Sequence, residues 1–255
     1  PTMVHAKLHG LTHHDTIFPL FLFIAGVSFP FSYAKQVASG MSKKSIYLKI
    51  LKRALILIAL GIVYNGFFKL DFENFRLASV LGRIGVAWGV AALLQMLFST
   101  RTRVVIAGSV LVAYGLVSQF VAAPDAVAGA DPLSLEGCLA GWIDRCLLPG
   151  RMYLGSMDPE GIFSTIPAVV TAMLGMLTGE FIRLPEERFS GRMKASMMAL
   201  AGVAFGVVGA LWSIALPINK TLWSSTFVCV LACYSLLLFA LFYYIIDVRG
   251  WQKWS

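Results

Sequence analysis

Four histidines and an aspartate stand directly before a long apolar run. The group comprises His5, His9, His13, His14 and Asp15. Histidine accepts and releases protons near neutral pH, and a neighbouring carboxylate can orient its ring and stabilise the protonated form. Ionisable groups at the mouth of a membrane span are costly to place and often mark a functional site. The alternative is a polar loop that merely flanks the span. The polar residues that other loops bring to the same side distinguish the two interpretations.

A second polar group lies in the segment Asp158-Pro159-Glu160-Gly161, just before another apolar run. Asp158 and Glu160 could line a binding site for a substrate. The structural alternative is that Asp158 caps the following helix, with Pro159 at its first position and Glu160 in its first turn.

Two further elements carry charge at span ends. Asn219 and Lys220 lie in a short turn between two apolar runs, where the alternative is simply a solvated turn. Arg83 lies inside a third run, where a cation needs a partner or a water-filled cavity unless it reaches the interface. We expect one cavity to hold Arg83 together with Asp15 and Asp158.

The histidines could instead bind a metal ion. His5, His9 and His13 would share one face of a helix, but Gly10 interrupts the segment and no H-E-x-x-H motif is present. We therefore favour proton transfer and predict no metal site.

The composition identifies the elements that must position these groups. The 255 residues are 58% hydrophobic and 13% charged, and the apolar residues form blocks long enough to cross a bilayer. We predict an all-α, polytopic transmembrane helical bundle with about seven spans. The expected spans are 16–38, 46–66, 78–98, 103–122, 162–182, 195–216 and 222–246.

Basic residues are concentrated on one side of these spans. If the spans alternate in direction, fourteen of the 21 Lys and Arg residues fall on the side opposite the histidines. The positive-inside rule then places that side in the cytosol, and His5–Asp15 and the acidic loop 123–161 outside. Because this topology explains the net charge of +8, we expect no nucleic-acid partner.

Small residues and cysteines suggest how the elements pack. The pairs Gly85/Gly89, Gly175/Gly179 and Gly202/Gly206 have the spacing that lets helices approach closely. We expect the loop 123–161 to pack over the outer mouth, with Cys138 and Cys146 either in a disulfide or as two free thiols. Cys229 and Cys233 read as small core residues.

Five stretches spread over the chain carry a family resemblance. They read HGLTHHDTIFPLFLFIAGVS (9–28), LGRIGVAWGVAALL (81–94), DPEGIFSTIPAVVTAMLGMLTGE (158–180), PINKTLWSSTF (217–227) and IIDVRGW (245–251). In these stretches the chain resembles the transmembrane acetyltransferase family of heparan-α-glucosaminide N-acetyltransferase and its bacterial relatives. The resemblance implies transfer of the acetyl group of cytosolic acetyl-CoA, across the membrane, to the amino group of a terminal glucosamine.

The resemblance also assigns roles to residues. It implies that His5 is the active-site histidine, and that Asp15, the Asp158–Gly161 turn and the Asn219–Lys220 turn line the same outer site. Leu8 stands where the family commonly has a tryptophan, which changes the contact expected on the acceptor side. The family has a further span before Pro1 and others after Ser255, so we expect the chain to be part of a longer protein.

Acetyl-CoA is a polyanion, so its phosphates should meet the basic cytosolic side. We expect Lys52, Arg53, Arg101 and Arg103 to bind it, although positive-inside sorting alone would also place them there. His5 could attack the thioester and become acetylated, or it could act only as a general base. Backbone N–H groups, Lys220 or Arg83 could stabilise the thioester oxygen.

These observations predict one transmembrane acyltransferase domain over residues 1–255, in a bacterial inner membrane with its active site on the periplasmic side. Its co-substrate is acetyl-CoA, and its partners are membrane lipid and an amino-sugar acceptor, with a homodimer left open. One alternative is an O-acyltransferase acting on an exported glycan. Another is a small-molecule transporter without chemistry, which paired inverted repeats with broken helices would favour.

Overall fold

The structure, a computed structural model, describes residue 10 and the ranges 12–66 and 75–251. This part of the chain is helical, and its only β-type pairings are two isolated bridges. The helices are α1 (His13–Ala38), α2 (Lys43–Tyr64), α3 (Val80–Leu97), α4 (Thr100–Phe120), α5 (Leu139–Leu147), α6 (Ile162–Ile182), α7 (Gly191–Trp212) and α8 (Ser225–Tyr243). A π-helical turn, η2 (Tyr244–Val248), continues α8.

The helix boundaries follow signals in the sequence. Five helices begin after a serine whose side chain accepts a hydrogen bond from the first turn, and these are Ser42, Ser79, Ser99, Ser190 and Ser224. Helix α1 begins with a capping box, in which Thr12 and Asp15 exchange hydrogen bonds. All seven expected spans form as helices, with boundaries within four residues of those predicted.

Six helices of the described part are long and apolar enough to cross a membrane, namely α1, α3, α4, α6, α7 and α8 with its π turn. The fold is therefore the predicted polytopic helical bundle of an integral membrane protein. Helix α2 differs because the first half of its sequence carries Lys43, Lys44, Lys49, Lys52 and Arg53.

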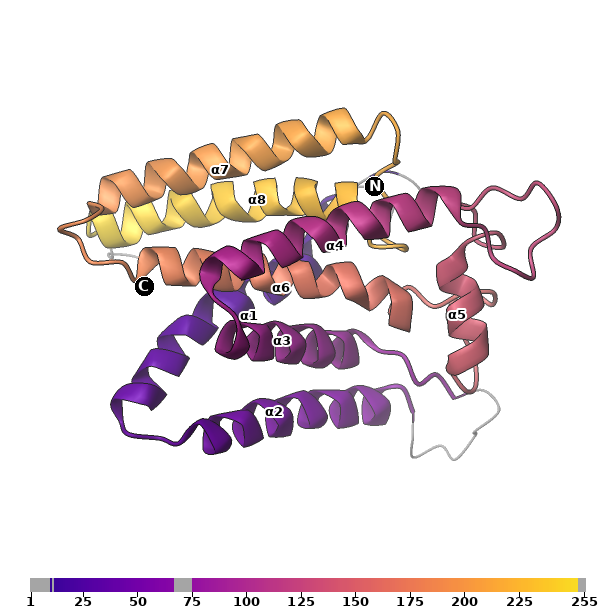
Figure 1. Ribbon diagram of the computed structural model, residues 1–255, viewed down its shortest axis with the longest axis horizontal. Coiled ribbons are helices and arrows are strands. Elements are labelled where there is room, and N and C mark those ends of the chain that lie inside the picture. The colour runs from indigo at the N-terminus through magenta and orange to yellow at the C-terminus, as the bar shows by residue number, and fades with distance from the viewer. Residues whose placement is uncertain (1–9, 11, 67–74, 252–255) are drawn as a thin grey trace.

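The helices pack in neighbouring pairs along the long axis of the bundle (Figure 1). Helix α7 packs on α8, α1 on α6, and α2 on α3, while α6 also contacts α3 and α4. Helix α6 is the most buried of the spans, and its side chains supply much of the core.

Glycines allow the closest of these approaches, as the sequence predicts. A Cβ atom on Gly175 would lie 2.1 Å from the carbonyl oxygen of Phe23, and one on Gly179 would lie 2.3 Å from that of Val27. Gly85 faces Ala54 of α2, and Gly206 faces Cys233 of α8. The backbones of these helices therefore touch where the sequence has its small residues.

The long loop between α4 and α6 folds over one end of the bundle (right in Figure 1). Cys138 and Ala140, at the start of its short helix α5, and Met157 from the following loop pack with Leu222 and Phe163. Cys138 is buried and Cys146 is exposed, and both are free thiols. The expected packing of this loop on the bundle is confirmed, and it covers the end at which α3, α6 and α8 begin.

Candidate active site at the polar end of the bundle

A cavity of about 930 Å³ opens at the end of the bundle near α5. Its wall includes the ionisable side chains of Asp15, Arg76, Glu160 and Lys220, with Tyr153 beside them. These groups come from α1, from the segment before α3, from the loop before α6 and from the turn before α8. Parts of the chain about 200 residues apart thus meet in one polar cavity, as Lys220 and Asp15 show.

Asp15 is held at the cavity by two neighbouring elements. Its side chain is buried and accepts hydrogen bonds from the backbone N–H and the hydroxyl of Thr12, at 3.1 and 2.8 Å. Its other oxygen lies 3.0 Å from the ammonium nitrogen of Lys220, which is partly exposed. This ion pair ties the first helix to the turn before α8 and leaves the ammonium group facing the cavity.

The turn that carries Lys220 is built by its neighbour Asn219. The Asn219 side chain is buried and accepts a hydrogen bond from the backbone N–H of Leu222, while its backbone N–H donates to Ser224. Trp223 takes a positive φ of 51°, and its N–H donates to the Lys220 carbonyl. Asn219 therefore shapes the turn that orients Lys220, and its side chain is not part of the cavity wall.

Asp158 is buried behind the cavity wall and binds the guanidinium of Arg76. Arg76 donates from Nε and Nη2 to the two carboxylate oxygens of Asp158, at 2.7 and 2.6 Å, and also to Glu160. Backbone N–H groups of Tyr153 and Glu160 donate to the same carboxylate. Burial disfavours the charge on Arg76, but the two carboxylates outweigh it and raise the pKa of its guanidinium.

Asp158 does not cap α6, which rules out the structural alternative considered for it. Helix α6 begins at Ile162 after Gly161, and the carboxylate at its N-terminus belongs to Asp144 of α5. Asp144 accepts hydrogen bonds from the backbone N–H groups of Ile162 and Asp158, at 3.0 and 3.3 Å. Burial raises the pKa of Asp144 to about 6, although both N–H groups act in the opposite direction.

Arg83 lies in the core of the bundle and not in the wall of the cavity. It is 3% exposed, donates to Ser164 and to the Gly161 carbonyl, and lies over the ring of Trp223. The prediction that one cavity holds Arg83, Asp15 and Asp158 is therefore wrong. Each of the three has its own partners: Arg83 bonds to Ser164, Asp15 to Lys220, and Asp158 to Arg76.

The histidine cluster is only partly covered by the described residues. His5 and His9 lie outside them, and His13 and His14 begin α1 with side chains that are also outside the described set. Gly10 is described, lines the cavity, and donates its N–H to the Ile218 carbonyl at 2.9 Å. The backbone next to His9 is thus fixed at the cavity beside the Lys220 turn.

Of the four basic residues expected to bind acetyl-CoA, Arg101 and Arg103 lie at the other end of the bundle, in the first turn of α4, whereas Lys52 and Arg53 lie near the middle of α2. Lys52, Arg53 and Arg101 are exposed, whereas Arg103 is buried and pairs with Glu180 at 2.7 Å. The guanidinium of Arg53 stacks over the ring of Trp88, 4.3 Å from its centroid. Arg53, Lys49, Gln36 and Trp88 also line a second cavity of about 320 Å³ between α1, α2 and α3.

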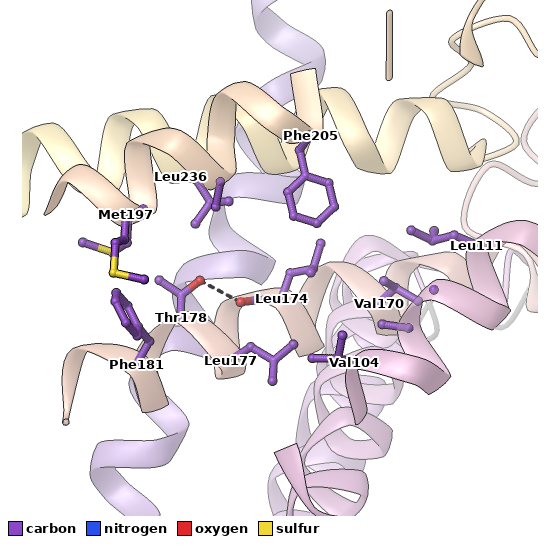
Figure 2. Close-up of a pocket in the computed structure, with 14 residues that line it drawn as sticks. Val104, Leu111, Val170, Leu174, Leu177, Thr178, Phe181, Met197, Phe205 and Leu236 are labelled. Carbon is purple, nitrogen blue, oxygen red and sulfur yellow. Dashed lines mark hydrogen bonds between the residues drawn. The ribbon is translucent and has the colours of Figure 1, made fainter. Parts of the chain in front are cut away.

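A third cavity is lined almost entirely by apolar side chains. It encloses about 450 Å³ between α4, α6, α7 and α8, and Figure 2 shows side chains such as Leu174, Met197 and Phe205 around it. The hydroxyl of its Thr178 donates to the Leu174 carbonyl at 2.8 Å. Since none of its lining residues is ionisable, the polar cavity is the better candidate for an active site.

Sequence reasoning missed two important residues of the polar end. Arg76 belongs to the cavity wall, and Asp144 caps α6 from α5. The segment around Arg76 has no recognisable motif, so the sequence offers little signal for its role. The nine-residue α5 could have been found from its strongly amphipathic pattern, which places Asp144 on the same face as Ala140 and Gly141.

Comparison with known proteins supports the resemblance seen in the sequence. The chain is 28% identical to the heparan-alpha-glucosaminide N-acetyltransferases of Mus musculus and of Homo sapiens, in alignments that cover 96% of the chain. The chain spans 45% of the length of these two proteins. No family model matches it. The chain is thus a distant relative of these acetyltransferases, and the predicted relationship is confirmed.

Proposed function

We propose that the protein transfers the acetyl group of acetyl-CoA to the amino group of a sugar of the glucosamine type. The proposal places transfer at the cavity formed by Asp15, Arg76, Glu160 and Lys220. The observation that carries it is the convergence of these groups beside Gly10 in a relative of N-acetyltransferases. Acetyl-CoA approaches from the basic end of the bundle, which lies in the cytosol of a bacterial cell, and the acceptor enters from the periplasm.

The cavity suits a polar, cationic acceptor. An amino sugar arrives largely as its ammonium form, and the carboxylates of Asp15 and Glu160 attract that charge. Arg76 and Lys220 hold these carboxylates in place and can donate to sugar hydroxyls. The aromatic ring of Tyr153, stacked under Arg76 at 4.8 Å, offers a flat face to the sugar ring.

The transfer step needs a base and a site for negative charge. The ammonium group first loses one proton to the water of the cavity. The neutral amine then attacks the thioester carbonyl, the C–N bond forms, and the C–S bond breaks to release the thiol of coenzyme A. In the proposal His5 takes the proton from the amine and returns it to the departing thiolate. In the two-step version His5 first carries the acetyl group itself and the amine then attacks. Lys220, which faces the cavity, stabilises the developing oxyanion better than the enclosed Arg83 can.

Acetylation with radiolabelled acetyl-CoA tests the proposal. The full-length protein in proteoliposomes should label glucosamine in a base-stable amide, and a hydroxyl acceptor of similar size should stay unlabelled. Label found only in a base-labile ester would show an O-acyltransferase instead. The His5→Ala protein should lose transfer while Lys220→Arg, which keeps the charge, should retain most of it. Wild-type turnover in His5→Ala would remove that residue from the mechanism.

A further inference from the structure

The larger polar cavity and the cavity beside Arg53 lie along one seam of the bundle. On α1, the larger cavity touches Phe18, Phe21 and Ala25, and the cavity at the basic end touches Ser28, Phe29 and Ser32. On α3, the larger cavity touches Leu81 and Ile84, and the other touches Trp88. Residues three or four apart share a helix face, so both cavities follow the same face of each helix. One helical turn separates them.

The Trp88 side chain occupies the space between α3 and α1 at this turn. Its side chain is buried, and its indole N–H donates to the Ala25 carbonyl of α1 at 3.2 Å. The ring meets Phe29 edge-on at 5.5 Å and carries the Arg53 guanidinium on its face. One side chain thus spans from α3 to α1 and closes the seam between the cavities.

The contacts that hold the Trp88 ring can be broken without leaving its partner on α1 unpaired. The Ala25 carbonyl also accepts a hydrogen bond from the Ser28 hydroxyl at 2.9 Å, so it keeps a partner when the indole moves away. The ring borders open volume in the basic-end cavity, and the larger cavity reaches Ile84 and Ala25, about one helical turn away. Arg53 is exposed and can follow the ring or leave it.

The basic-end cavity also contains groups that fit a narrow chain with amide bonds. The Gln36 side chain donates to Ser32, while its buried Oε1 has no hydrogen-bond partner among the described residues. A pantetheine chain carries amide N–H groups that such an acceptor could bind. Lys49 and Arg53 lie at the same cavity, where phosphates attached to that chain would meet positive charge.

We infer that Trp88 is a gate between the two cavities, and that it opens to let the acetyl-pantetheine arm reach Asp15 and Lys220. This inference rests on the proposed function, because it takes acetyl-CoA as the molecule that passes. Trp88 is then a positioning residue. Its ring keeps the seam closed until it moves aside, and the thioester can enter the polar cavity only after that movement.

Thiol labelling tests the gate without any acetyl transfer. A cysteine is placed at Ile84, on the far side of Trp88, in full-length protein with Cys146→Ser, reconstituted in sealed vesicles. A membrane-impermeant, sulfonated thiol reagent is then added to the side of Lys49 and Arg53. Trp88→Ala should raise the labelling rate at least about tenfold. Trp88→Phe, which keeps an aromatic ring but loses the N–H and part of the bulk, should raise it about fivefold.

A matched control and a ligand complete the test. Phe205→Ala enlarges the apolar cavity between α6 and α7 and should leave the labelling rate unchanged. Coenzyme A added to the same side should slow labelling in every Trp88 variant. A Trp88→Phe rate equal to wild type, or an equal rise in Phe205→Ala, overturns the gate. Labelling that coenzyme A does not slow overturns the passage of pantetheine. If acetyl transfer fails while labelling behaves as expected, the fault lies in the proposed function.

Discussion

The two ends of the bundle carry their charges in different ways. At the polar end, Asp15, Asp144 and Asp158 are buried, and each accepts several hydrogen bonds from neighbouring elements. In the basic half of the bundle, Lys52, Arg53 and Arg101 are exposed, although Arg103 pairs with Glu180. The polar end therefore uses its charges to fix the shape of a cavity.

This difference has a physical reason. A carboxylate buried beside span ends loses its water and must be compensated by nearby donors, so it constrains the elements that supply them. An exposed lysine or arginine keeps its water and leaves the backbone free. Substitutions at the polar end should thus change stability and activity together, whereas those at the exposed basic positions should change ligand binding alone.

Asp158→Asn should have the largest effect on stability. The amide directs an NH₂ group at Arg76 and leaves a partly buried guanidinium without its bidentate acceptor. Because Glu160 still pairs with Arg76, we expect a loss of about 3 kcal/mol in the free energy of unfolding, measured by denaturant titration of the detergent-solubilised protein.

Asp125→Asn is the matched control for this change. Asp125 pairs with Arg145 through a similar bidentate contact, but its side chain is 48% exposed. The control should lose less than about 1 kcal/mol. Equal losses in the two variants would contradict the difference between buried and exposed charges.

The sequence predicts the helices far better than it predicts the polar contacts. Apolar length and serine caps determine where a span can lie, so even the boundaries are close to those observed. The ion pairs depend on how distant loops fold over the bundle. Asp15, Glu160 and Lys220 could be named as one group, but the partner of Asp158 is Arg76, in a segment without a motif. The capping role assigned to Asp158 belongs to Asp144 because α5 brings a second carboxylate to α6.

Asp144 should make stability depend on pH. Because burial raises its pKa from 3.8 to about 6, the folded protein holds a proton that the unfolded chain has already released. Its stabilising contribution is full below about pH 4 and is lost as the pH rises through about 6, at a cost of at most about 3 kcal/mol. Unfolding curves between pH 4 and 7 should show this fall in the wild type, and Asp144→Asn should remove it. Asp131→Asn, in an exposed part of the loop, should leave the fall intact.

Glu180→Gln should have a smaller effect at the basic end. It removes the charge that faces Arg103, whose side chain is almost fully buried but also bonds to Thr100 and to the Phe98 carbonyl. These remaining partners limit the loss to about 2 kcal/mol in the free energy of unfolding. The exposed Glu187→Gln should have no measurable effect in the same titration. A loss as large as that of Asp158→Asn would mean that the basic end is also held together by its charges.

Arg53→Gln should change stability least and affect binding of acetyl-CoA. Its stacking on Trp88 is an exposed cation–π contact, so its removal should cost less than about 1 kcal/mol. Loss of one charged contact to a phosphate should raise the apparent KM for acetyl-CoA about tenfold. The kcat should stay close to wild type, because Arg53 lines the smaller cavity and not the one that holds Asp15 and Lys220. Arg53→Lys should recover most of the affinity, since it restores the charge. A fall in kcat without a change in KM would instead place Arg53 in the transfer step. The assignment of acetyl-CoA binding to the basic residues and of transfer to the polar end would then be wrong.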